Sequence, residues 1–173
     1  MKKLLIIIAS LCCFGVLAMA QESVDADAKY ATEMIKKGAK VPSLVMNDPS
    51  GVSHNLKSYR GKWVVLDFWA SWCPDCRQDM PAMKQLYEQY ASDKIAFIGV
   101  SFDTEREKLV GYVADNDIPW LQLCDYQKKK DSTVGKAFQV KWIPSMYLID
   151  PKGRVVIGTV MIEKLAAELS KIK

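Results

Sequence analysis

The sequence lacks a strong excess of charge of either sign, and it contains no internal repeat, no low-complexity stretch and no linker-like segment after residue 40. Its 173 residues carry a formal net charge of +4, which falls to +2 when Lys2 and Lys3 are set aside with the first twenty residues. Nucleic-acid binding depends on many phosphate contacts, so this small charge argues against that function. The one basic run, Lys128–Lys130, is predicted to be a solvated turn. A chain of this length without linkers is predicted to form one domain.

Histidine and cysteine are both scarce. His54 is the only histidine, and the first twenty residues hold two of the five cysteines, which leaves Cys73, Cys76 and Cys124. A structural zinc site usually needs four ligands, so it would require all of these residues without a second closely spaced pair. A cysteine–histidine hydrolase would need His54 as its base, yet a solvated or hydrogen-bonded histidine is expected in its short polar strand. We therefore predict no metal site, and one pair with one leftover cysteine is too sparse for a disulfide-rich domain.

The first twenty residues contain the one long apolar run. Lys2 and Lys3 precede the stretch LLIIIASLCCFGVL, and the small residues Ala18-Met19-Ala20 follow it. A basic, an apolar and a small-residue part in this order are typical of a secretory signal peptide. We predict residues 1–20 to be removed and the protein to be periplasmic or otherwise extracytoplasmic. The alternative is an uncleaved membrane anchor, because the apolar stretch is only slightly shorter than a typical span.

The rest of the chain alternates between strand and helix patterns. Residues 24–37 are predicted to form an amphipathic helix that ends at Gly38, within an N-terminal extension of residues 21–37, and residues 38–173 are predicted to form the domain itself. The predicted strands are two short ones around a turn at Asp48–Gly51, then Trp63–Trp69, Lys94–Ser101, Trp120–Cys124 and a hairpin of Ser145–Asp150 and Arg154–Thr159. Two helices are predicted to begin at Pro74, with Pro81 inside, and at Arg106, after a capping box of Thr104 and Glu107. Two more are predicted near Ser132–Phe138 and over about Ile162–Ile172. This order implies an α/β sheet of mixed direction.

The stretch WASWCPDCR contains a cysteine pair immediately after the most apolar predicted strand. Cys73 precedes Pro74 and should therefore lie at a helix N-terminus, where negative charge on sulfur is stabilised. We expect an exposed Cys73 with a lowered pKa as the nucleophile and a shielded Cys76, one turn further on, as the resolving thiol. A purely structural disulfide is the alternative, but so short a loop constrains the unfolded chain little.

With this pair between strand and helix, the sequence resembles the thioredoxin superfamily and, more narrowly, the TlpA/ResA-type exported thiol-disulfide oxidoreductases. Three further matches surround the pair: Asp67 six residues before Cys73, Pro81 five residues after Cys76, and the Ile143-Pro144 dipeptide. Spaced residues from Gly38 to Lys62 also match the N-terminal hairpin of that branch, and the segment between residues 101 and 143 is long. The resemblance covers about residues 38–170. It implies a thioredoxin-like fold, with a central mixed β-sheet flanked by helices, an N-terminal β-hairpin and an inserted helix.

The resemblance also implies a role for Asp67. In this family an acid at that position is buried beneath the cysteine pair, where burial raises its pKa and lets it exchange a proton with Cys76. Many TlpA/ResA-type chains have a neutral residue there, so this site is more thioredoxin-like. The alternative for Asp67 is a hydrogen-bonded structural acid. No cofactor is implied other than the redox-active disulfide Cys73–Cys76.

Substrate contacts follow from the same resemblance. A cis peptide bond between Ile143 and Pro144 would place the Ile143 backbone beside the disulfide, where an extended substrate chain can pair with it. Trp72 would form an apolar collar, and Pro74 and Asp75 would border the substrate between the cysteines. The alternative for Trp72 is ordinary core packing.

The direction of electron flow is predicted from Asp75 together with Asp67 and Ile143. The charge of Asp75, partly offset by Arg77, opposes a thiolate at Cys73 and makes the couple less oxidising. This favours a reductase of disulfide-containing envelope proteins, itself re-reduced by a membrane electron donor as the family resemblance implies. The alternatives are a disulfide donor or isomerase, and a peptide-binding module with a structural disulfide. A peroxiredoxin-like peroxidase is disfavoured, because its signature proline and threonine are replaced by Leu66 and Ala70. Cys124 is predicted to be a buried, inert residue, with a regulatory disulfide as the alternative.

Overall fold

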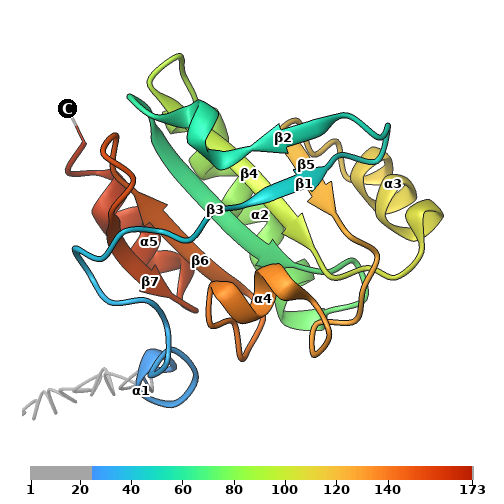
Figure 1. Cartoon of the computed structure of the whole chain (residues 1–173), viewed down its shortest axis with the longest axis horizontal. Helices are drawn as coiled ribbons and strands as arrows, with labels where there is room; N and C mark the ends of the chain where they lie inside the picture. Colours follow the sequence, from blue (N-terminus) through green and yellow to red (C-terminus); the bar gives the residue numbers. More distant parts are fainter. Residues whose placement is uncertain (1–24, 173) are drawn as a thin grey trace, which may run out of the picture.

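The computed structural model describes residues 25–172 and has a five-stranded sheet at its centre (Figure 1). The strands are ordered β5-β4-β3-β6-β7, with bounds Leu121–Cys124, Ile95–Ser101, Trp63–Trp69, Ser145–Ile149 and Val155–Thr159. Strands β3, β4 and β5 are parallel, whereas β6 is antiparallel to β3 and β7 is antiparallel to β6. The predicted α/β fold with a sheet of mixed direction is confirmed.

Strand β3 is central because its sequence, WVVLDFW, has almost no polar residue to present to solvent. Only Trp63 is partly exposed, and the other six residues are buried. A strand covered on both faces is expected to be continuously apolar in this way. Asp67 is the exception, and it is buried at a position opposite Gly99 of β4 and Met146 of β6.

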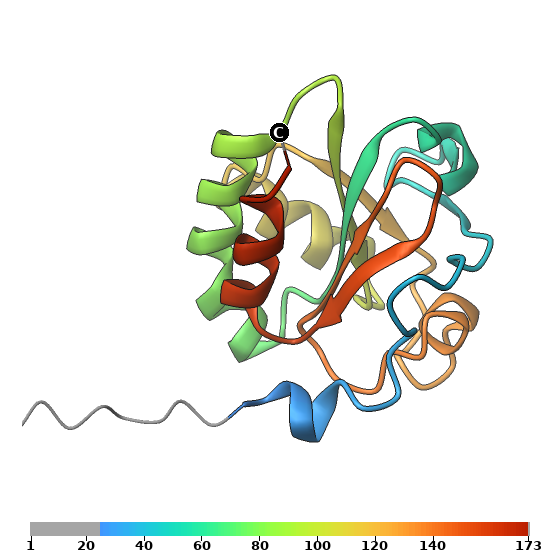
Figure 2. The ribbon, with the colours of Figure 1, turned by 90° about the vertical axis from the view of Figure 1, so that its left-hand side faces the viewer.

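Helices cover one face of the sheet, and a hairpin with shorter helices covers the other. Figure 2 shows α2 and α5 side by side against one face with α3 further back, and α4 and the β1–β2 hairpin on the opposite side. The helices α2, α3, α4 and α5 span Pro74–Tyr90, Arg106–Asp115, Thr133–Ala137 and Ile162–Leu169, and the short helix η1 spans Leu56–Tyr59. Strands β1 and β2 are Val45–Asn47 and Ser53–Asn55. The predicted N-terminal hairpin and inserted helix, α3, are both present.

Several predicted boundaries are confirmed in detail. Helix α2 begins at Pro74 and contains Pro81, and Ser132 caps α4 by accepting the backbone N–H of Gly135. The turn at Asp48–Gly51 joins β1 to β2. These ends lie where the local sequence signals placed them.

The predicted helix over residues 24–37 is wrong in extent. Helix α1 comprises only Asp27–Tyr30. The Asp27 carboxylate accepts the backbone N–H of Val160 at 2.8 Å and an ammonium proton of Lys164 at 2.7 Å. These contacts hold the chain against the region between β7 and α5, so tertiary contacts override the helical pattern.

Two helix ends also differ from the sequence prediction. The capping box of Thr104 and Glu107 is wrong, because the N-cap of α3 is Glu105, whose side chain makes no capping hydrogen bond and instead pairs with Lys108 at 2.6 Å. Helix α5 ends at Leu169 and not near residue 172, since Leu169 is the last buried residue of its apolar face.

Within residues 25–172, no helix has both the length and the hydropathy of a transmembrane span. The predicted signal peptide or anchor, residues 1–20, lies outside the described residues.

Gly99 and Gly111 lead to opposite predictions for substitution by alanine. A Cβ atom at Gly99 would lie 2.1 Å from Oε1 of Gln122, a buried side chain that accepts the indole N–H of Trp69 at 2.9 Å. Gly99→Ala is therefore expected to lower the free energy of unfolding by about 1–3 kcal/mol.

A Cβ atom at Gly111 in α3 would meet no atom within 4 Å. Gly111→Ala is therefore expected to raise the free energy of unfolding by about 1 kcal/mol.

Urea denaturation of the wild type and both variants measures these changes. A Gly99→Ala protein as stable as the wild type would show that Gln122 can move aside without loss of its hydrogen bond.

Candidate functional site

The cysteine pair lies where strand β3 ends and helix α2 begins. Cys73 is the N-cap residue of α2 and has an extended backbone, and Pro74 follows it in the first turn. The Cys73 sulfur accepts the backbone N–H of Cys76 at 3.2 Å, and both cysteines are free thiols. The predicted position of the pair at the helix N-terminus is confirmed.

The prediction that Cys73 is exposed is wrong. Cys73 keeps only 4% of its surface exposed, and Cys76 keeps 3%. The Cys73 sulfur lies 3.7 Å from the carbonyl oxygen of Ile143, in the loop that leads into β6. Because β6 is antiparallel to β3, the start of β6 lies beside the end of β3, and its loop covers the thiol.

The residues predicted to contact substrate surround this sulfur. Trp72, Pro74 and Asp75 are exposed, and Trp72 keeps 55% of its surface, so core packing does not explain it. The Ile143–Pro144 peptide bond is cis, as predicted, and both residues are buried. An exposed rim on the α2 side therefore lies next to a buried backbone segment.

Asp67 and Cys76 face the same small cavity. This cavity, of about 10 Å³, is also lined by Asp79 and Pro144. Asp67 is buried, and its Oδ1 has no hydrogen-bond partner within the part of the chain that the structure describes. Burial, and then the charge of Asp79, raise the pKa of Asp67 from its ordinary value of 3.8 to about 7. The prediction of a buried acid with a raised pKa is confirmed.

Asp79 is a site residue that sequence reasoning missed. It lies three residues after Cys76, which is close to one helical turn, so both side chains point from the same side of α2 into the cavity. Asp79 is half-buried, and desolvation, followed by the charges of Glu163 and Asp75, raises its pKa to about 6. The sequence feature that could have revealed this residue is an acid about one helical turn after the second cysteine.

The Cys76 thiol is unusually hard to ionise. Burial, and then its contacts with the Cys73 sulfur, raise the pKa of Cys76 far above its ordinary value. A thiol in this state needs a base before it can react as thiolate at neutral pH. Asp67 and Asp79 line the same cavity, and the pKa of each lies near neutrality. The arrangement can therefore transfer the Cys76 proton to a carboxylate.

A buried carboxylate holds the loop between β3 and α2. Asp103 accepts both the backbone N–H of Ser71 at 3.0 Å and its hydroxyl at 2.6 Å. The hydroxyl of Ser101 donates to the same carboxylate at 2.6 Å. Ser71 is two residues before Cys73, so these bonds fix the chain that positions the sulfur. Sequence reasoning missed Asp103 because its partner Ser71 is distant in the sequence and only the sheet brings them together.

Cys124 and His54 lie apart from the pair. Cys124 is buried in β5, its thiol donates to the Asp103 carbonyl at 3.2 Å, and burial raises its pKa to about 11. The prediction that Cys124 is buried is confirmed. The His54 ring forms a hydrogen bond with the Asp48 carboxylate at 3.0 Å. Among the described residues, no three histidine, cysteine or acidic side chains are grouped to hold a metal ion.

Asp67→Asn is expected to make the protein more stable at alkaline pH. Because folding raises the Asp67 pKa from 3.8 to about 7, the folded state holds the proton more tightly than the unfolded state. Wild-type stability is then greatest below pH 4 and falls as the pH rises through 7. The difference corresponds to about 4 kcal/mol above pH 7, which the neutral amide avoids. Urea unfolding under reducing conditions at pH 4, 6 and 8 measures it.

The exposed residue Asp93 provides the control. Asp93→Asn should not change the pH dependence, and an Asp67→Asn effect that is equal at all three pH values would contradict the assigned cause.

Known proteins resemble this chain over most of its length. Residues 37–157 match the model of the AhpC/TSA family. Thioredoxin-like protein YneN of Bacillus subtilis is 35% identical over 141 residues, which cover 78% of this chain and 79% of that protein. Thiol-disulfide oxidoreductase ResA of Geobacillus thermodenitrificans is 30% identical over 151 residues, which cover 84% of each chain. The thioredoxin domain of a thiol-disulfide oxidoreductase from Bacteroides vulgatus matches with a TM-score of 0.71 and 26% identity, covering 79% of this chain and 97% of that one.

The family match begins at residue 37, next to the predicted start of the domain at residue 38. It includes Asp67, the cysteine pair and the Ile143–Pro144 loop, which are the residues on which the sequence resemblance was based. The chain therefore belongs to the AhpC/TSA family, and its thioredoxin-like fold and its relatives identify it as one of the ResA-type thiol-disulfide oxidoreductases.

Proposed function

We propose that this protein is an exported reductase whose Cys73–Cys76 dithiol reduces disulfides in other envelope proteins. The observation that carries this proposal is the hydrogen bond from the Cys76 backbone N–H to the Cys73 sulfur at 3.2 Å. The N-terminus of a helix stabilises negative charge, and a cysteine reacts as its thiolate. Cys73 is therefore the nucleophile, and Cys76 is the resolving thiol.

The reaction has two exchange steps. The Cys73 thiolate attacks one sulfur of the substrate disulfide, and the bond between the two substrate sulfurs breaks. The released substrate thiolate takes up a proton, and a mixed disulfide remains on Cys73. The Cys76 thiolate then attacks the Cys73 sulfur and releases the second substrate thiolate, which is also protonated. The substrate gains two electrons and two protons, and the enzyme is left with the Cys73–Cys76 disulfide.

Asp67 and Asp79 accept the proton that Cys76 must lose in the second step. Both carboxyls line the cavity that Cys76 faces, and both have a pKa raised toward neutrality. A volume of about 10 Å³ is near the lower limit for one water molecule, which would connect the thiol to a carboxylate. A base whose pKa is close to the working pH is the most effective for this transfer.

Substrate reaches the buried sulfur along the Ile143 backbone. An extended substrate chain can pair with backbone as an added strand, and pairing at Ile143 would bring its disulfide beside Cys73. The Ile143 carbonyl lies 3.7 Å from the Cys73 sulfur, so it marks the line of approach. Trp72, Pro74 and Asp75 are exposed beside it and contact the substrate on the other side.

Asp75 favours reduction over the alternative roles of disulfide donor or isomerase. Its charge lies between the two cysteines and disfavours a thiolate at Cys73, which makes the couple less oxidising. Each turnover leaves the enzyme oxidised, so a membrane electron donor must reduce it again. The dithiol carries both electrons, so no separate cofactor is needed. Residues 1–20 direct export to the periplasm or another extracytoplasmic compartment, with membrane attachment only if they remain uncleaved.

Cys76→Ser is expected to trap substrates on Cys73. Without the resolving thiol, the mixed disulfide formed in the first step cannot be released by the second. The purified variant is incubated with envelope extract, and adducts are identified by non-reducing gels and mass spectrometry. The double variant Cys73→Ser/Cys76→Ser is the matched control and should form none.

Absence of adducts with any protein or small disulfide would mean that Cys73 is not the nucleophile. A reduction potential far below the working range of the envelope, together with no reduction of insulin, would support a peptide-binding module. Consumption of peroxide by the same preparation tests the peroxidase alternative.

Asp67→Asn and Asp79→Asn are each expected to slow release of the mixed disulfide by about tenfold or more at pH 7. The attack by Cys73 should change little, because these carboxyls face Cys76. A single-turnover reaction with a small neutral disulfide, stopped with acid and analysed by mass spectrometry, gives the two rates separately. Equal slowing of both steps would contradict the proton-transfer role, and Asp93→Asn serves as the control.

A further inference from the structure

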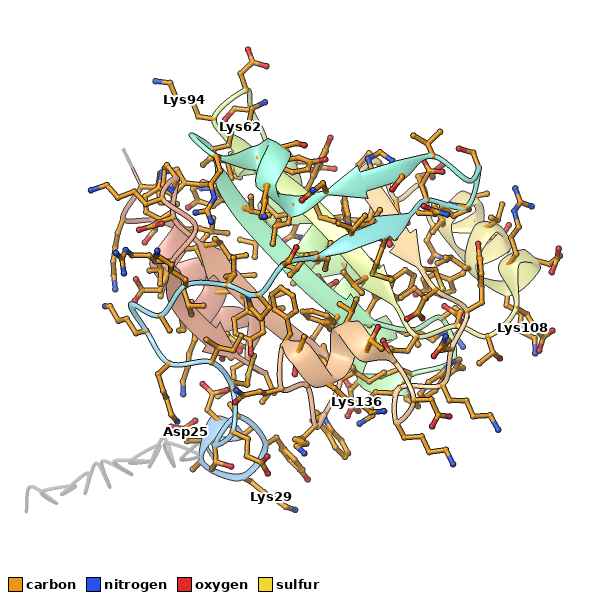
Figure 3. All side chains as sticks on the ribbon, viewed as in Figure 1. Asp25, Lys29, Lys62, Lys94, Lys108 and Lys136 are labelled. Atoms are coloured by element: carbon orange, nitrogen blue, oxygen red, sulfur yellow. The ribbon has the colours of Figure 1, made fainter. Side chains whose placement is uncertain are left out.

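Four lysines line a hollow on the α4 side of the site. The hollow has a volume of about 410 Å³ and lies between the loop before α4, α4 itself and the chain that leads to Ile143. Its charged side chains are Lys129, Lys130, Lys136, Lys141 and Glu33. Figure 3 shows Lys136 at the end of the molecule where α4 lies.

Most of this positive charge is not neutralised. Lys141 pairs with Glu33 at 3.3 Å. Within residues 25–172, the ammonium groups of Lys129, Lys130 and Lys136 form no ion pair. Lys129 donates to the Lys141 carbonyl, and Lys136 donates to the Asp131 carbonyl at 3.3 Å, but a carbonyl carries no net charge. The hollow therefore has three positive charges in excess.

A hydrogen bond from Lys129 joins this hollow to the chain that covers the Cys73 sulfur. The carbonyl that it binds belongs to Lys141, two residues before Ile143, whose own carbonyl lies 3.7 Å from the Cys73 sulfur. Burial lowers the pKa of Lys129, and negative charge on Cys73 opposes that shift. The prediction that Lys128–Lys130 is merely a solvated turn is therefore wrong for Lys129, which is partly buried.

The opposite side of the cysteine pair carries the other sign of charge. Asp75 is exposed on α2, and the charges of Glu163 and Asp75 both raise the pKa of Asp79. The cysteine pair thus lies between acids of α2 and α5, partly offset by the exposed Arg77 of α2, and a basic side at α4. A substrate chain that crosses the site meets both.

We propose that the lysine hollow binds acidic side chains of the substrate segment next to the disulfide, so that disulfides flanked by aspartate or glutamate are preferred substrates. This inference rests on the proposed function, because it names the substrate class of the same site. Complementary charge at the edge of a binding surface raises the association rate and selects among partners. The ammonium groups of Lys130 and Lys136, which form no ion pair with any described residue, supply that charge without taking part in the exchange chemistry.

Two disulfide-closed cyclic peptides test the preference, one with three aspartates beside a cysteine and the other with three asparagines. Pre-reduced protein is mixed with each peptide in single-turnover reactions. We expect the wild type to reduce the acidic peptide about tenfold faster at low ionic strength. The difference should shrink in about 0.5 M salt, because salt screens exposed charges.

Lys130→Gln/Lys136→Gln should lose the preference for the acidic peptide. The matched control, Lys62→Gln/Lys94→Gln, removes the same charge at the opposite end of the molecule, where Figure 3 shows both lysines. It should keep the preference. Reduction of bis(2-hydroxyethyl) disulfide, which is neutral, should be equal in all three proteins.

Equal rates on both peptides with the wild type, or a preference that survives in Lys130→Gln/Lys136→Gln, would overturn the inference and leave the proposed function intact. If the control variant lost the preference as fully as Lys130→Gln/Lys136→Gln, the preference would depend on net charge alone, and this result would also overturn the inference. A wild type that reduces neither peptide nor the neutral disulfide would instead contradict the proposed function.

Discussion

The sulfur of Cys73 accepts the backbone N–H of Cys76, and this contact ties the start of helix α2 to the end of strand β3. The first N–H groups of any helix lack partners within it, so a cap must come from the preceding chain. Here the capping atom is also the atom proposed to attack substrate. Local folding and chemistry therefore impose the same requirement on one side chain, and the position of the helix determines the environment of the thiol.

The surrounding structure holds that sulfur in place from two directions. On one side, the Asp103 carboxylate binds Ser71 through both its backbone and its hydroxyl, which fixes the loop before Cys73. On the other side, antiparallel pairing of β6 with β3 brings the Ile143 carbonyl to the thiol. A site held from neighbouring strands is more rigid than one held by its own loop, and rigidity suits a reaction that needs sulfur atoms in line.

Asp67 and Asp79, the two acids next to the cysteine pair, are unfavourable for the stability of the fold, which indicates a functional role. Asp67 occupies a position in the central strand that its neighbours fill with apolar side chains, and Asp79 adds a like charge beside it. Burial of a carboxyl without a partner is unfavourable. Exceptions to local rules of this kind are expected at functional sites. The raised pKa values and the deep Cys76 thiol are consistent with proton exchange as the reason for this exception.

The sequence by itself determined most of the elements and the reactive pair, because the apolar run of β3 and Pro74 after Cys73 are local signals. The cis bond between Ile143 and Pro144 was expected from the family resemblance. The sequence did not reveal the burial of Cys73, the partnership of Asp79 with Asp67, or the attachment of Lys129 to the Lys141 carbonyl. These features join segments distant in the chain, or depend on which face of a helix meets the sheet. Only the tertiary structure decided them, through the order of the strands, the face of α2 that packs on the sheet and the path of the chain around α4, because periodicity specifies which side chains point inward but not which segment covers them.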